Sequence, residues 1–124
     1  MTPARLVREF HEKFGFPVAD TPGLADEELA SARQRFLDEE VNEVRKAVEA
    51  GDLENLAQEL ADVIYVTYGT ALTYGIDLDE VLARVHRSNM TKEGSQDGKA
   101  VKGPDFEPVD LSDLFPDDPE EPEE

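Results

Sequence analysis

A glycine followed directly by an aspartate, Gly51-Asp52, constrains the fold of this chain more than any other feature. Glycine readily adopts the left-handed conformation that ends a helix, and aspartate is a favoured cap at the start of the next one. Long segments rich in helix-forming residues lie on both sides. Because so short a link leaves no room for a crossover, we expect two long helices, over about residues 26–50 and 53–74, packed antiparallel.

Two shorter helices are predicted outside this pair. Thr2 and Pro3 suit the start of a helix that ends at Gly15, and a last helix is expected over about residues 77–89. Glycines and prolines make the segment after residue 91 irregular, with one hairpin around Asp97-Gly98. The sequence therefore predicts an all-α protein, a four-helix bundle-type protomer with an irregular C-terminal segment.

The composition indicates a single domain in a reducing compartment. The 124 residues include no cysteine, which excludes disulfides and thiolate metal sites and makes the cytoplasm the natural setting. No apolar stretch reaches the roughly 18 residues of a membrane span, so no membrane partner is expected. We expect one domain over residues 1–115 and a disordered tail over residues 116–124, which are all proline and acid.

The formal net charge of −18 limits the ligands that this chain can bind. Nucleic acid is excluded as a partner of broad electrostatic binding, because that requires a basic face. A polyanionic substrate would be repelled as well. If the chain handles phosphates, a divalent metal held by carboxylates is the simplest source of positive charge.

Residues 63–72, in the second long helix, are apolar or weakly polar on nearly every side. A helix with no charged face is buried all round, and four short helices offer too little surface for that. The segment therefore predicts self-association into a homodimer or homotetramer.

Each long helix carries an apolar stripe, which predicts the face turned to the core. The stripes consist of Leu37, Val41, Val44 and Val48 on the first helix and Leu53, Leu56, Leu60 and Ile64 on the second. At about 100° of rotation per residue, Glu39, Glu40 and Glu43 form one band beside the first stripe. Glu59 and Asp62 project side by side next to the second.

Four of these acids are expected to converge. Glu43 and Glu59 are about equally far from the turn at Gly51-Asp52, and Glu40 and Asp62 lie one helical turn further out. Like charges that converge destabilise the fold unless a cation lies between them. All-oxygen ligands favour a hard ion, chiefly Mg²⁺, with Mn²⁺ expected to substitute. The alternative is a solvated acidic surface.

The two acidic segments, Glu39-Glu40-Val41-Asn42-Glu43 and Glu59-Leu60-Ala61-Asp62, resemble the EExxE…ExxD signature of the MazG-like all-α nucleoside triphosphate pyrophosphohydrolases. This superfamily includes dimeric dUTPases and phosphoribosyl-ATP pyrophosphatases, and the chain is most similar to its small stand-alone bacterial and phage members. The resemblance implies Mg²⁺ ligation by Glu40, Glu43, Glu59 and Asp62. It also implies catalytic roles for Glu39 and Glu40, with Glu39 holding a further ion or orienting the attacking water.

The same resemblance implies substrate contacts beyond the acids. Asn89 and Lys92 are expected near the sugar and phosphates of the nucleotide. Lys99 and Lys102 either extend a positive rim or are ordinary surface lysines. His11 either lines the base pocket or is a packing residue.

The reaction implied is Mg²⁺-dependent hydrolysis of a (deoxy)nucleoside triphosphate between its α and β phosphates, giving a nucleoside monophosphate and pyrophosphate. The favoured substrate is dUTP or another pyrimidine or non-standard nucleotide. The alternative is a non-catalytic helical dimer, stapled by metal, that binds a nucleotide or a protein partner. A di-iron bundle is disfavoured because no Glu-x-x-His motif is present.

Overall fold

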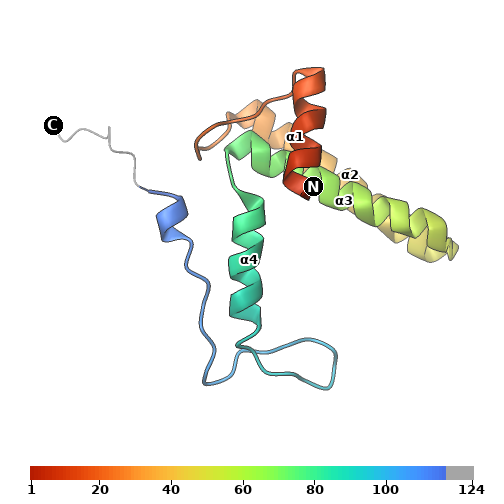
Figure 1. Ribbon diagram of the computed structural model, residues 1–124. Coiled ribbons are helices and arrows are strands. Elements are labelled where there is room, and N and C mark those ends of the chain that lie inside the picture. Colours follow the sequence, from red (N-terminus) through yellow and green to blue (C-terminus); the bar gives the residue numbers. More distant parts are fainter. Residues whose placement is uncertain (117–124) are drawn as a thin grey trace. The chain divides into compact units, whose positions relative to one another are not determined.

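The computed structural model describes residues 1–116 (Figure 1). Its helices are α1 (Pro3–Phe14), α2 (Glu27–Ala50), α3 (Leu53–Tyr74) and α4 (Leu78–Asn89), followed by the short 3₁₀ helix η1 (Ser112–Leu114). Extended pairing within residues 1–116 is limited to one isolated bridge, Glu93 with Val101. The predicted all-α class is confirmed. From residue 117 onward, the predicted acidic tail lies outside the described residues.

The turn between α2 and α3 has the geometry that the sequence predicts. Gly51 has a φ of 66°, in the left-handed region, and its N–H donates to the last turn of α2. The Asp52 carboxylate accepts a hydrogen bond of 3.0 Å from the backbone N–H of Asn55, which caps α3. As a result, α2 and α3 lie side by side and run antiparallel (Figure 1).

Residues 1–78 form one compact unit in which α1 packs against α3 at Gly69. His11 is 2% exposed, and its Nδ1 donates to the carbonyl oxygen of Pro17 at 2.9 Å. Arg33 reaches from α2 to the carbonyl oxygen of Val66 at 3.1 Å. A Cβ atom on residue 69 would lie 2.6 Å from the Arg33 guanidinium and 2.8 Å from His11 Nε2, so this approach requires glycine.

The two apolar stripes are only partly buried, which corrects the prediction that both face the core. The buried apolar residues of the described chain are Val7, Ala47, Tyr68 and Ala71. Five stripe residues are more than half exposed: Val41 (56%), Val48 (59%), Leu53 (80%), Leu60 (51%) and Ile64 (52%). Only a small surface is available for packing in a helical hairpin with one short helix against it. The exposed residues of both stripes therefore have no packing partner within residues 1–78.

Residues 79–116 form a second unit, built on α4 and the segment that follows it. The Arg84 guanidinium contacts the carboxylates of Glu80, at 2.9 Å, and Asp113, at 2.5 Å. The Ser88 hydroxyl donates to the carbonyl oxygen of Glu107 at 2.7 Å. These contacts hold the irregular segment against the helix. No helix within residues 1–116 is both long enough and apolar enough to cross a membrane.

Candidate metal centre

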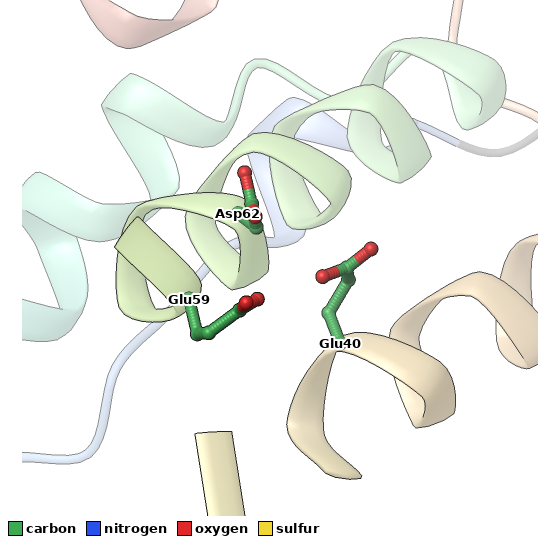
Figure 2. Close-up of side chains that lie close together, drawn as sticks. All are labelled: Glu40, Glu59 and Asp62. Carbon is green, nitrogen blue, oxygen red and sulfur yellow. The ribbon is translucent and has the colours of Figure 1, made fainter. Parts of the chain in front are cut away.

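Three carboxylates from two helices point toward one another, as Figure 2 shows: Glu40 from α2, and Glu59 and Asp62 from α3. Each offers one oxygen that lies within 4.8 Å of the other two. All three side chains are half-buried. Their positions follow from the turn at Gly51-Asp52, because residues equally far from the turn of an antiparallel pair lie level with each other.

Two further predicted site residues stand beside this cluster. The charge of Glu43 acts on both Glu40 and Glu59, but its carboxylate lies 3.5 Å from the Lys46 ammonium group. Glu39 is exposed, and its charge acts on Glu40. The structure thus brings together three of the four predicted metal ligands and places Glu43 at the edge, paired with a lysine.

Burial and repulsion raise the pKa values of two of the clustered acids. The pKa of Glu40 is raised by partial burial first and then by the negative charges of Asp62, Glu43 and Glu39. The pKa of Glu59 is raised by the same kinds of cause, and also by its hydrogen bond with Asp62. For both residues, the folded structure disfavours the ionised form relative to the protonated form. A cation among these oxygens would therefore stabilise the site.

The donor set fits a divalent ion that prefers oxygen. Because Mg–O bonds are about 2.1 Å long and the geometry is octahedral, neighbouring oxygens around the ion lie about 3.0 Å apart. The three oxygens, which lie within 4.8 Å of one another, would move closer together around an ion placed between them. Three carboxylates without His or Cys favour Mg²⁺ or Mn²⁺ over softer metals.

The predicted substrate residues lie in the second unit. Asn89 and Lys92 both line a hollow of about 240 Å³ at the end of α4, together with Lys102 and Phe106. Lys99 does not line it. The sequence prediction did not single out Phe106, because an aromatic residue in an irregular segment has no periodicity that would place it. His11 is buried in the first unit, which agrees with a packing role.

The antiparallel pair α2 and α3 brings carboxylates together from the EExxE and the ExxD segment, an arrangement that suits a divalent ion and the chemistry of phosphoric anhydrides. Residues 7–89 match the profile of the phosphoribosyl-ATP pyrophosphohydrolase family. The match spans more than half of the chain, which therefore belongs to this family, a branch of the MazG-like superfamily. No curated protein matches the sequence.

Family membership makes this protein a nucleotide pyrophosphohydrolase, an acid anhydride hydrolase that acts on a nucleotide derivative. The family is typically dependent on a divalent metal, which agrees with the acidic cluster. The match includes all the clustered acids and ends at Asn89. Lys92, Lys102 and Phe106 lie beyond it.

Replacing Glu40 by glutamine is expected to stabilise the metal-free protein at neutral pH. Because the folded-state pKa of Glu40 is raised above 4.5, the folded protein holds more protons than the unfolded chain between those two pKa values. The free energy of unfolding therefore falls as the pH rises through that window. Glutamine cannot ionise and escapes this loss. In thermal melts with chelator, Glu40→Gln should melt above the parent at pH 7, and the gap should close as the pH falls to about 4.

The matched control is Glu9→Gln, which removes an exposed carboxylate on α1 from the same protein of net charge −18. An equal gain in melting temperature for both variants would show that general charge repulsion, and not the cluster, is responsible.

Proposed function

We propose that this protein hydrolyses a (deoxy)nucleoside triphosphate between its α and β phosphates, in a Mg²⁺-dependent reaction that releases a nucleoside monophosphate and pyrophosphate. The favoured substrate is dUTP or another pyrimidine or non-standard nucleotide. The observation that carries the proposal is the convergence of Glu40, Glu59 and Asp62 in a chain of this family. Such a cluster destabilises the fold without a cation, and a triphosphate is repelled by this protein without one.

Glu40, Glu59 and Asp62 are proposed to hold the ion from two sides, since they come from two helices. Mg²⁺, or Mn²⁺ in its place, supplies shielding of the phosphate oxygens and a bound water of lowered pKa. Glu43 is proposed as the fourth ligand, for which it would leave Lys46. Breaking this ion pair costs little free energy, because both of its side chains are about half exposed. Such surface pairs contribute roughly 0–1 kcal/mol to the stability of a protein.

Glu39 and Glu40 are the proposed catalytic residues. Glu39 is exposed next to Glu40, which suits it to accept a proton from the attacking water or to hold a further ion. The water oxygen forms a bond to one phosphorus of the α–β anhydride, and the bridging oxygen leaves with the other. Because water is the nucleophile, the reaction needs no covalent intermediate on a side chain.

Asn89 and Lys92 are the proposed substrate contacts. They line one hollow in the second unit, which supports a shared role. Lys92 supplies a positive charge suited to phosphate, and the Asn89 amide offers both a donor and an acceptor suited to the sugar.

We further propose that the chain forms a homodimer or homotetramer through the helical hairpin. Each hairpin helix has exposed valines or leucines seven residues apart, Val41 and Val48 on α2, and Leu53 and Leu60 on α3. A spacing of seven residues keeps side chains on one side of a helix, as in helices that pack lengthwise. A second copy of the chain, packed against the hairpin, would bury the exposed residues of both stripes.

The reaction is tested by incubating the purified protein with Mg²⁺ and each of dUTP, dCTP, dTTP and ATP, and identifying the products by chromatography. We expect monophosphate and pyrophosphate, with a pyrimidine preferred. Glu59→Gln should lower turnover by roughly 10² to 10³-fold, as for loss of one electrostatic stabiliser, with the helical content unchanged. Glu54→Gln, an exposed acid five residues earlier on α3, is the control and should keep full activity.

Release of diphosphate and orthophosphate would contradict the proposed bond. Nucleotide binding without any turnover would favour the non-catalytic alternative. Equal activities of the Glu59 and Glu54 variants would remove Glu59 from the site.

Self-association is tested by sedimentation velocity. The parent is expected to sediment as a species at least twice the chain mass of 13.8 kDa. Val48→Glu, which places a charge on the exposed α2 stripe, should shift the protein toward monomer. Leu24→Glu is the control, because Leu24 is 96% exposed in the loop before α2 and lies outside the hairpin. A monomeric parent, or equal behaviour of the two variants, would contradict the proposed interface.

A further inference from the structure

The hollow at the end of α4 differs in charge from the rest of this protein. The chain has 30 acidic and 12 basic residues, yet two lysines, Lys92 and Lys102, line this hollow and no carboxylate does. Within residues 1–116, neither lysine forms an ion pair. A site lined by two uncompensated cations, in a protein of net charge −18, is suited to an anion.

The fold brings the two lysines together from positions ten residues apart. After α4, the backbones of Glu93 and Val101 exchange two hydrogen bonds of 2.8 Å, which turns the chain back on itself. Gly103 then passes so close to Glu93 that a Cβ atom would lie 2.2 Å from its carboxylate. This close return places Lys102 and the residues after it beside the end of α4.

Phe106 holds the Lys102 side chain in place. The Lys102 Nζ atom lies 5.2 Å from the centre of the Phe106 ring, a cation–π contact. That contact restricts a flexible side chain without using its N–H groups, because the ring face attracts the charge as a whole. All three N–H donors of Lys102 thus stay available for a ligand.

The size of the hollow indicates which part of a nucleotide it suits. Pockets that enclose a whole small-molecule ligand measure about 300–1,000 Å³. At about 240 Å³ this hollow is smaller, and its polar lining offers chiefly ammonium groups, the Asn89 amide and the Ser88 hydroxyl. The two ammonium groups are the part of this lining that suits a phosphate chain, and the apolar part consists of Val85, Phe106, Pro108 and Val109.

A second hollow with two cations has a different character. It lies in the first unit, has a volume of about 270 Å³, and is lined by Arg5 and Arg8 together with Asp20 and Asp77. Arg8 also lies 3.9 Å from the Asp20 carboxylate. Mixed charges of this kind cancel locally, so this hollow, unlike the one at the end of α4, does not favour an anion.

We propose that Lys102 is a second phosphate-binding residue, and that Lys92 and Lys102 together bind the phosphate chain of the nucleoside triphosphate. Phe106 is the positioning residue that holds Lys102. This inference rests on the proposed function and extends it to residues beyond the end of the family match.

The kinetic test compares Lys102→Gln with Lys99→Gln, which removes the same charge from the same segment but outside the hollow. Loss of one charge-assisted hydrogen bond to phosphate should raise the KM for the best nucleoside triphosphate about tenfold at low salt. The kcat should change much less, because binding of the substrate and of the transition state weaken alike. The difference in KM should shrink as ionic strength rises, and Lys99→Gln should match the parent.

The role of Phe106 is tested by a pair of substitutions. Phe106→Leu keeps an apolar side chain but removes the ring, and should raise KM at unchanged kcat and melting temperature. Phe106→Tyr keeps the ring and should restore the KM of the parent. If both variants behave alike, Phe106 does not position Lys102.

A direct binding test separates this inference from the proposed function. Isothermal titration calorimetry with inorganic tripolyphosphate and Mg²⁺ needs no turnover. We expect clear binding to the parent and to Lys99→Gln, and binding at least several-fold weaker to Lys102→Gln. Equal affinities for all three proteins would overturn the phosphate site even if the parent hydrolyses nucleotides. If the parent hydrolyses none, the proposed function fails, and this titration still decides the inference.

Discussion

Repulsion between carboxylates is the interaction around which the first unit is organised. The packing of α2 against α3 requires acids on facing helices to lie within 4.8 Å of one another. The turn at Gly51-Asp52 sets that register, so the packing of the two helices fixes which acids face one another. The pKa values of Glu40 and Glu59 are raised by partial burial first and by this repulsion second. A site that is unfavourable when empty favours a cation when one is present.

Much of this arrangement could be predicted from the sequence, because its determinants are local. Gly51 and Asp52 act through their own backbone and side chain, so they predicted the helix ends and, by counting from the turn, the meeting of Glu40 with Asp62. The choice between competing partners was harder to predict. Glu43 was expected among the metal ligands, but in the structure it pairs with a lysine one helical turn away. Spacing along a helix does not tell whether such an acid binds a metal ion or a neighbouring lysine.

Two other features depend on contacts that periodicity does not encode. Val41 and Val48 were predicted to face the core, but a stripe pattern cannot tell a face that is covered within the chain from one that the chain leaves exposed. Phe106 acquires its contact with Lys102 only because the chain turns back after α4. The two proposed sites differ in charge: the first unit carries acids that favour a metal ion, and the second carries lysines that are suited to an anion.

The most direct test of this account is the thermal shift that Mg²⁺ causes in the parent and in the double variant Glu40→Gln/Asp62→Asn. At a hundredfold excess over Kd, preferential binding to the folded state adds about 2.7 kcal/mol, which for a domain of this size raises the melting temperature by several degrees. We expect that shift for the parent. For the double variant we expect a higher melting temperature without metal but little response to Mg²⁺. An identical shift in both proteins would mean that the ion binds elsewhere, and would contradict the metal centre proposed on α2 and α3.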